Sequence, residues 1–254
     1  MELNKLIFGD CFDYFKNIPN ESIDLILTDP PYGINLKDGI SRNPLKEIKN
    51  DSKDDIDWKI FFSESYRILK QNKMLYLCCR MDFIFRLSKY IQESEFIYSH
   101  DFIWLKGDMG YGNLKIMGTT HEFIIALCKG NPEKSMSIKI DNEIKKRTPA
   151  IYWGKVTTKE YYQHPTQKPI GMMAYIILNR TKEKDLIFDP FAGVSSTLIA
   201  AKMTKRSYLG IELDEDFYNL SNKRIHDENY LKMFENLENR FIRYNGAVKL
   251  ESLN

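Results

Sequence analysis

The sequence predicts an α/β fold with a mostly parallel β-sheet, and three observations lead to this prediction. Short apolar runs rich in β-branched residues recur along the chain, and stretches with apolar residues at helical spacing lie between several of them. Strands that alternate with helices form βαβ units, in which consecutive strands run parallel. Four of the runs end at an acidic residue, and open α/β sheets bind their ligands at the carboxyl ends of the strands.

The predicted elements follow in chain order. Strands are expected at residues 6–8, 23–28, 74–79, 102–105, 123–128, 186–188 and 208–211, and helices at 58–69, 170–178 and 196–203. The acidic residues at strand ends are Asp10, Asp29, Asp189 and Glu212. Asp is a common turn residue, so a single one would carry little meaning. Four of them on one edge of a sheet predict a polar cleft.

The run Ile23–Thr28 and the segment Asp29–Tyr32 after it carry the most information. The run predicts a buried strand. The two prolines of the segment lack an N–H and fix φ, so the backbone is rigid and its carbonyls are free to accept hydrogen bonds. A planar group with an amino function would fit here, stacked on Tyr32 with its N–H groups directed at Asp29 and the Pro30 carbonyl. Asp-Pro and Pro-Pro are also common in turns, and an ordinary turn explains this motif alone equally well.

Two segments break the alternation of strands and helices. Residues 33–55 are mixed in charge and poor in apolar side chains, which predicts a mobile loop directly after Tyr32. Residues 129–163 have no clear period and contain eight basic against four acidic residues, with four aromatic residues among them. Basic residues interleaved with aromatic ones suit a nucleic-acid surface, although solvated charge on a surface excursion would give the same pattern.

The segment Asp189–Thr197 follows a predicted strand and leads into a predicted helix. Its small residues allow the backbone to approach a ligand closely, and the helix N-terminus offers unpaired N–H groups to a carboxylate. Glu212 ends the next strand about 20 residues later, where an acid can accept hydrogen bonds from both hydroxyls of a ribose. This arrangement indicates a nucleoside cofactor. The chain lacks the G-x-G-x-x-G of dinucleotide enzymes and the G-K-[ST] of triphosphate-binding loops.

Length and composition set the outer limits. The 254 residues suit one large domain, or one domain with a small insert. The formal charge of +2 is close to neutral, so affinity for nucleic acid must come from local patches. No run is long enough to cross a membrane, the N-terminus lacks signal-peptide features, and the four cysteines show no metal spacing. We expect a cytoplasmic protein with reduced thiols and no metal. Residues 227–254 predict a charged helical tail whose apolar face packs on the core rather than forming a dimer seam.

Three motifs together resemble those of the DNA amino-methyltransferases that use S-adenosyl-L-methionine, and the resemblance covers nearly the whole chain. Asp29–Tyr32 is similar to the catalytic motif of that family, Asp189–Gly193 to its cofactor motif, and His164–Pro169 to a third element just before the cofactor strand. Residues 9–11 and 120–123 also resemble family segments. The order of catalytic motif, recognition region and cofactor motif is the permuted order of the β group.

The resemblance implies a Rossmann-like, mostly parallel sheet of a class I methyltransferase with helices on both faces and a small inserted DNA-recognition region. It divides the chain into a catalytic half, a target-recognition region, a cofactor-binding half and a C-terminal helical tail. The corresponding ranges are 1–128 with the mobile loop 33–55, then 129–163, 164–227 and 228–254.

The resemblance also implies roles for single residues. In the cofactor site, Asp10 would bond the adenine amino group, Glu212 would hold the ribose and Lys168 would pair with the methionine carboxylate. No role is assigned to His164, which otherwise suits a turn. The expected catalytic residues are Asp29, Pro30, Pro31 and Tyr32. The expected cofactor-binding residues are Asp10, Cys11, Asp29, Lys168, Asp189, Phe191, Ala192, Gly193, Ser195, Ser196, Thr197, Glu212 and Leu213. The expected DNA-binding residues are Lys145, Lys146, Arg147, Trp153 and Lys155.

One departure from the family pattern lies in the cofactor motif. The family usually has a second glycine where this chain has Ser195, and a threonine where it has Ser196. Serine is small enough for a close approach, but a positive φ at Ser195 would be strained. We therefore expect either weaker cofactor binding or a slightly different path of the loop.

The implied reaction is direct methyl transfer to an exocyclic amino group of a flipped base. Asp29 and the Pro30 carbonyl would bind that amino group and favour a pyramidal nitrogen, and Tyr32 would supply a stacking face. The chain has no Pro-Cys pair, which argues against attack on carbon 5 of cytosine. In the family, Asp at the head of the motif goes mostly with adenine and Ser with cytosine, so adenine N6 is the preferred target.

Two alternatives and several partners stay open. Cytosine N4 is the alternative within the same class. A degenerate, non-catalytic subunit that binds DNA or a partner is the alternative from another class. Ser195 supports it, and the intact residues that oppose it are Asp29, Tyr32, Asp10 and Glu212. The expected substrate is a short specific sequence in double-stranded DNA. A homodimer and a cognate restriction endonuclease are partners that the sequence leaves undecided, and no membrane contact is expected.

Overall fold

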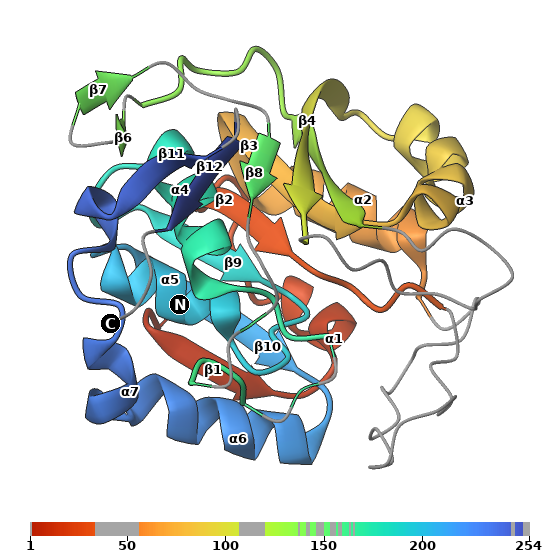
Figure 1. The fold of residues 1–254 in the computed structure, drawn as a ribbon. Coiled ribbons are helices and arrows are strands. Elements are labelled where there is room, and N and C mark those ends of the chain that lie inside the picture. The colour runs from red at the N-terminus through yellow and green to blue at the C-terminus, as the bar shows by residue number, and fades with distance from the viewer. Residues whose placement is uncertain are drawn as a thin grey trace, which may run out of the picture.

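Ten strands in the described part of the chain form one sheet with helices on both faces, as the computed structural model shows (Figure 1). The structure describes residues 2–33, 56–106, 120–136, 138–140, 143–145, 150–152, 156, 159–162, 164, 166–244 and 247–250. The strands of this sheet are β1 (Lys5–Phe8), β2 (Ile23–Thr28), β3 (Leu69–Cys79), β4 (Ile97–Leu105), β5 (His121–Cys128), β8 (Ala150–Tyr152), β9 (Leu186–Asp189), β10 (Ser207–Glu212), β11 (Phe241–Tyr244) and β12 (Ala247–Leu250). The short strands β6 (Ile138–Ile140) and β7 (Glu143–Lys145) pair with each other.

The helices cover the sheet from both sides. They are α1 (Cys11–Phe15), α2 (Trp58–Ile68), α3 (Met81–Glu93), α4 (Ile170–Arg180), α5 (Ser196–Met203), α6 (Glu215–His226) and α7 (Glu228–Lys232), followed by the 3₁₀ helix η1 (Leu237–Asn239). The helices α1, α2 and α3 pack on one face, and α4, α5 and α7 pack on the other (Figure 1). None of the described helices is long and apolar enough to cross a membrane.

The strand order is β1-β10-β9-β2-β3-β5-β4-β8-β12-β11. The five strands from β1 to β3 run parallel to one another, whereas β5 is antiparallel to both β3 and β4. The predicted mostly parallel α/β fold is therefore confirmed. The order also places β2 directly beside β9, with Leu25 opposite Ile187. As a result, the two sequence motifs that follow these strands meet at one edge of the sheet.

Alternating side chains of the strands divide the core into two layers. In β2, Leu25 and Leu27 belong to the layer under α4 and α5, whereas Ile26 belongs to the layer under α1, α2 and α3. In β3, Tyr76 and Leu77 face opposite layers in the same way. All six residues of β2 are buried, as expected for a strand covered on both faces. Two buried layers hold the carboxyl ends of the central strands rigidly in place.

Most local predictions match the observed elements. The predicted helix 196–203 coincides with α5, and α2 begins at Trp58, where the Asp57 carboxylate caps the helix by accepting from the Ile60 N–H at 3.0 Å. No predicted helix corresponds to α1, α3 or α6. Of these, α3 carries apolar residues at helical spacing, with Phe83 and Leu87 buried and Ile84, Tyr90 and Ile91 packed against the same core.

The prediction of a helical tail for residues 227–254 is wrong for the second half of that segment. The helix α7 and η1 occupy the first half, and their buried residues Tyr230, Phe234 and Leu237 pack on the core as expected. The chain then forms β11 and β12, an antiparallel pair that joins the main sheet through β8. The pair Asn245-Gly246, which lies between these strands in the sequence, is the strongest short hairpin signal. This hairpin signal was missed because the apolar residues in the first half of the segment follow helical spacing.

Candidate active site

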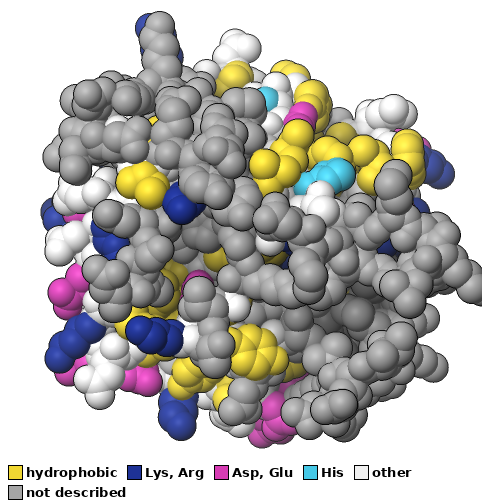
Figure 2. Space-filling view, viewed as in Figure 1, with side chains coloured by type: hydrophobic (Ala, Val, Ile, Leu, Met, Phe, Trp, Pro, Cys, Tyr) yellow, Lys and Arg dark blue, Asp and Glu magenta, His cyan; other side chains and the backbone are white. Residues whose placement is uncertain are grey.

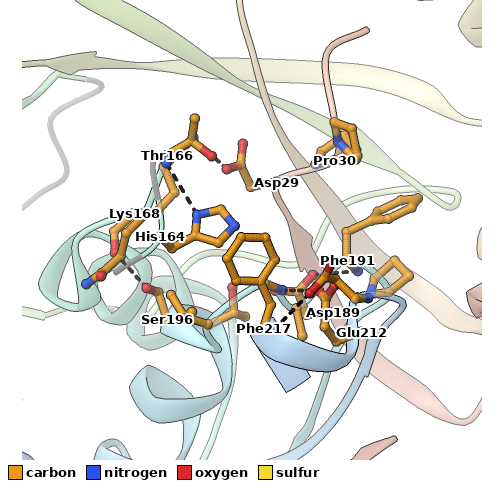
Figure 3. Close-up of a pocket in the computed structure, with 18 of the residues that line it drawn as sticks. Asp29, Pro30, His164, Thr166, Lys168, Asp189, Phe191, Ser196, Glu212 and Phe217 are labelled. Carbon is orange, nitrogen blue, oxygen red and sulfur yellow. Dashed lines mark hydrogen bonds and ion pairs between the residues drawn. The ribbon is translucent and has the colours of Figure 1, made fainter. Parts of the chain in front are cut away.

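A cavity of about 550 Å³ lies at the carboxyl ends of the parallel strands, a size typical of small-molecule sites. Asp10, Asp29, Asp189 and Glu212 all line it. The four acidic strand ends therefore meet in one cleft, as predicted. In Figure 3, Asp29 and Pro30 lie on one side of the cavity, and Asp189, Phe191 and Glu212 lie on another.

Two protein donors occupy the Asp29 carboxylate, which follows β2. The Tyr32 hydroxyl donates to its Oδ1 at 2.6 Å, and the Lys168 ammonium donates to its Oδ2 at 2.6 Å. The Tyr32 ring packs on Phe83 with 5.1 Å between the ring centroids, and the Arg86 guanidinium donates to the Tyr32 carbonyl. The segment that the prolines stiffen is thus also fixed by α3, which carries Phe83 and Arg86.

Four alternating charges run from Asp29 toward the rim of the cavity. The Lys168 ammonium also lies 3.5 Å from Oε2 of Glu122, and the Glu122 carboxylate forms a second ion pair with Lys106. Lys168 is only 5% exposed. Burial by itself lowers the pKa of Lys168, but Asp29 and Glu122 outweigh it and raise that pKa above its ordinary value. Lys168 therefore stays protonated. Its ammonium contacts Asp29, whereas the resemblance implied a contact with the methionine carboxylate of the cofactor.

The same charges act on the two carboxylates. Burial raises the pKa of Asp29 above its ordinary value, although Lys168 opposes this. Burial also acts to raise the pKa of Glu122, but Lys168 and Lys106 together hold it below its ordinary value. Glu122 is therefore an anion with two cationic neighbours. Trp104 of β4 lines the cavity beside them, with the ammonium of Lys168 at 5.7 Å and that of Lys106 at 4.8 Å from its ring centroid.

Asp189, at the end of β9, fixes the neighbouring strand end. Its Oδ1 accepts from the Thr28 hydroxyl at 2.6 Å and from the Phe191 N–H at 3.1 Å. Burial raises the pKa of Asp189 to about 6. The bond to Thr28 ties β9 to β2 directly below Asp29, so this carboxylate sets the relative position of the two motifs.

Glu212, at the end of β10, holds the loop that enters α5. Its Oε2 accepts from the Gly193 N–H at 2.7 Å, and its Oε1 accepts from the Asp214 N–H at 2.8 Å. Burial raises the pKa of Glu212 to about 7, although these two N–H groups oppose the shift. Each carboxylate oxygen has lone pairs beyond these two contacts, and Glu212 lines the cavity.

Ser195 adopts the left-handed conformation that its glycine counterpart would favour, with φ of +62° and ψ of +36°. The loop therefore keeps the backbone conformation that a glycine would favour. The positive φ at Ser195 is the strained conformation that the sequence raised as a possibility. The side chain is fully buried and its hydroxyl hydrogen-bonds that of Ser221 on α6. Gly193, two residues earlier, also has a positive φ of +52°.

A buried arginine on α6, for which no sequence pattern predicted a role, supports this loop. The Arg224 guanidinium is 0% exposed and donates to the Val194 carbonyl at 2.6 Å and to the Ser196 hydroxyl at 3.2 Å. It also donates to the Tyr230 hydroxyl. Ser196 in turn donates to the carbonyl of Lys168 at 2.7 Å. Arg224 thereby connects α6, the cofactor loop and the backbone that carries Lys168.

The segment before α4 completes the wall of the cavity. His164 packs against Phe217 of α6 with 4.4 Å between the ring centroids (Figure 3), and its Nδ1 accepts from the Thr166 N–H at 3.3 Å. Glu160 accepts from the Ile170 N–H at 2.7 Å and so caps the first turn of α4. Burial is the main cause that raises the pKa of Glu160 above its ordinary value.

The remaining wall comes from the start of α1. The Asp10 carboxylate accepts from the Phe12 N–H at 2.9 Å and so caps this helix. Cys11 is buried, and burial is the main cause that raises the pKa of its thiol. A thiol in that state is not a nucleophile. The Phe191 ring packs on Phe61 of α2 with 5.8 Å between the centroids.

The structure brings most of the predicted site residues together. The predicted residues that line the cavity are Asp10, Cys11, Asp29, Pro30, Pro31, Tyr32, Lys168, Asp189, Phe191, Ala192, Gly193, Ser196, Thr197, Glu212 and Leu213. Ser195 lies in the same loop, buried beneath it. Lys146, Arg147, Trp153 and Lys155 lie outside the described residues, as do residues 34–55 and the side chain of Lys145. Glu122 lies in a segment that resembles the family, whereas no sequence signal pointed to Lys106, Trp104, Phe217 or Arg224.

The comparison with known families agrees with this site. A family model described as DNA methylase, for N6 and N4 methyltransferases, matches residues 23–223. The chain belongs to the DNA methylase family. It is therefore a DNA amino-methyltransferase, and the resemblance drawn from its motifs is confirmed. Members of the DNA methylase family take their methyl group from S-adenosyl-L-methionine.

Curated relatives and solved structures of the DNA methylase family are similar along most of the chain. The type II methyltransferase M2.MboI of Moraxella bovis is 31% identical over 242 residues, which is 86% of each chain. The type II methyltransferase M.HinfI of Haemophilus influenzae is 29% identical over 251 residues, covering 89% of this chain and 69% of that protein.

Two solved structures share the fold at lower identity. The complex of M1.HpyAVI with S-adenosylmethionine has a TM-score of 0.67 at 23% identity, covering 87% of this chain and 98% of that one. The cytosine-N4-specific PvuII DNA methyltransferase has a TM-score of 0.72 at 20% identity, covering 93% and 91%. These likenesses concern the fold, which is that of a class I methyltransferase.

Proposed function

We propose that this protein transfers a methyl group from S-adenosyl-L-methionine to N6 of a flipped adenine in a short specific sequence of double-stranded DNA. The observation that carries the proposal is the single cavity that joins the Asp29–Tyr32 segment to Gly193 and Glu212. A hydrogen-bonding group for an amino nitrogen and a site for a nucleoside therefore face the same space.

The residues of the cofactor side fit S-adenosyl-L-methionine. Gly193 has no side chain and a positive φ, which lets its backbone approach a ligand. The Glu212 carboxylate would hold the ribose hydroxyls, Asp10 would accept from the adenine amino group, and Phe191 would pack near the adenine. When bound, the cofactor supplies an activated methyl group on a sulfonium centre.

The residues of the base side act on the amino nitrogen. That nitrogen is a poor nucleophile because its lone pair is delocalised into the ring. Asp29 and the Pro30 carbonyl would accept its two N–H groups and stabilise the pyramidal geometry that is reached only near the transition state. Tyr32 and Trp104 line the same cavity and would offer apolar faces that exclude water around the flipped base.

The DNA surface is proposed to include residues 129–163, the target-recognition region. On the face seen in Figure 2, the described Lys and Arg side chains are scattered among acidic ones rather than gathered in a stripe. The net excess of basic residues in 129–163, read from the sequence, supports the recognition role. Replacing Lys145, Lys146 and Arg147 with Ala should weaken DNA binding and flatten its salt dependence. Unchanged affinity and salt slope would refute this role.

Asp29 supports adenine N6 over cytosine N4, because an acidic residue at the head of this motif goes mostly with adenine in the family that the chain resembles. The relatives M2.MboI and M.HinfI are named type II methyltransferases. We also propose that the protein works in the cytoplasm, in a restriction–modification system with a cognate endonuclease. The four cysteines are buried and free, which supports a reducing compartment.

The decisive experiment identifies the methylated base. DNA from a methylation-deficient host that expresses the protein should yield N6-methyldeoxyadenosine on digestion to nucleosides and mass spectrometry, and long-read sequencing of the same DNA should reveal the target site. N4-methyldeoxycytidine instead would overturn the choice of adenine. Absence of both products, with a folded protein that still binds DNA, would support the non-catalytic alternative.

A further inference from the structure

The Asp29 carboxylate has a competitor for the position that the target amino group needs. Lys168 donates to Oδ2 of Asp29 at 2.6 Å, and the Tyr32 hydroxyl takes Oδ1 at 2.6 Å. An ammonium binds a carboxylate more strongly than a neutral amino group does. The amino group of an entering base therefore competes with Lys168 for the Asp29 carboxylate, because the ammonium weakens the remaining lone pairs as acceptors.

Glu122 offers the displaced ammonium a second position. Its Oε2 is buried and accepts no hydrogen bond within the described part of the chain, yet it lies only 3.5 Å from the Lys168 ammonium. Its Oε1 is held by Lys106. The ammonium is a compact charge on a flexible four-carbon stem, so a small rotation of the side chain exchanges Asp29 for Glu122.

Burial makes this second position necessary. Lys168 is 5% exposed, and Glu122 is also largely buried, with 12% of its side chain exposed. A buried charge that loses its partner destabilises the protein strongly. Without Glu122, the ammonium would have to stay on Asp29 or remain unpaired, and either outcome opposes binding of the base.

We propose that Glu122 is a positioning residue that takes over the Lys168 ammonium when Asp29 binds the amino group of the target base. This inference rests on the proposed function. Positive charge develops on the amino nitrogen during methyl transfer, and an Asp29 released from Lys168 stabilises that charge more strongly. Lys106 keeps Glu122 in place and ionised while the exchange occurs.

The test replaces Glu122 with Gln, which keeps the shape and removes the charge. At saturating cofactor and target DNA, we expect the single-turnover methylation rate of E122Q to fall about 10- to 100-fold. The fluorescence rise of 2-aminopurine placed at the target position should fall as well. The dissociation constant for sinefungin, measured by calorimetry, should stay within about twofold of wild type. The matched control is E183Q, because Glu183 forms an exposed ion pair with Lys205 at 3.2 Å.

A double-mutant cycle with Lys168→Met separates this role from a merely structural one. With the ammonium absent, Glu122 has nothing to take over, so E122Q should cause less than about a twofold further loss in the K168M background. An equal loss in both backgrounds would overturn the proposal, as would a wild-type rate for E122Q or an equally large loss of sinefungin binding. Absence of methylation by the wild-type protein would instead overturn the proposed function.

Discussion

Lowering the pH is expected to weaken cofactor binding through Glu212. The proposed ribose contact needs lone pairs on an ionised carboxylate, and burial raises the pKa of this group to about 7. Protonation adds a donor where the ribose hydroxyls also donate, so affinity falls as the pH falls through that value. The ionised fraction drops from about 90% at about pH 8 to about 10% at about pH 6, which predicts a roughly tenfold rise in the dissociation constant.

Isothermal titration of the protein with S-adenosyl-L-methionine across this range measures the effect. The variant Glu212→Gln is the control, because it keeps the acceptor oxygen and cannot ionise. It should bind more weakly than wild type at high pH and show a flatter pH profile, since any titration of the cofactor or of other residues is common to both proteins. A wild-type profile with the same slope as the variant would refute the role of the Glu212 charge.

Four further predictions concern the base side and the stability of the cofactor loop. Asp29→Ala should abolish methyl transfer while cofactor binding by calorimetry persists; a fully active variant would contradict the catalytic role. Tyr32→Phe should retain the 2-aminopurine signal of base flipping because the ring remains, whereas Tyr32→Ala should lose it; equal signals in the two variants would argue against stacking. Arg224→Met should lower the free energy of unfolding by about 3 kcal/mol, because it leaves buried acceptors without their donor, and urea denaturation measures this. Ser195→Gly should be nearly neutral alone, because relief of the positive φ offsets an orphaned Ser221 hydroxyl, and should stabilise by about 1 kcal/mol when combined with Ser221→Ala; a clear loss of stability in the double variant would contradict this.

Local patterns sufficed where an element is stabilised by its own sequence and by burial on both faces. The strand β2 was predicted because all of its residues except Asp24 are apolar or β-branched. In the structure all six residues are buried. The helix α5 was predicted because apolar residues recur at helical spacing between residues 196 and 203. Joining the hairpin β11–β12 to the sheet could not be predicted locally, since β12 pairs with β8, which is distant in the chain. The helix α3 was missed although its apolar residues Phe83, Ile84, Leu87 and Ile91 follow helical spacing.

The partners of buried charges could not be predicted from the sequence. Lys168 was expected to face the cofactor carboxylate, and the structure shows its ammonium on Asp29 and near Glu122. Arg224 gave no signal at all, because an arginine on an amphipathic helix usually faces solvent. Which carboxylate a cation meets depends on the packing of several elements together, and periodicity describes each element alone.

The sequence by itself determined the α/β class, the four acidic strand ends and the motifs that identify the DNA methylase family, because these depend on residue type and spacing. Only the tertiary structure decided how those ends are used. The parallel order of β10, β9 and β2 gathers Glu212, Asp189 and Asp29 at one edge of the sheet, and folding buries Lys168 between Asp29 and Glu122. Burial in a region of low dielectric makes every such charge depend on its neighbours, and neighbours exist only once the chain has folded.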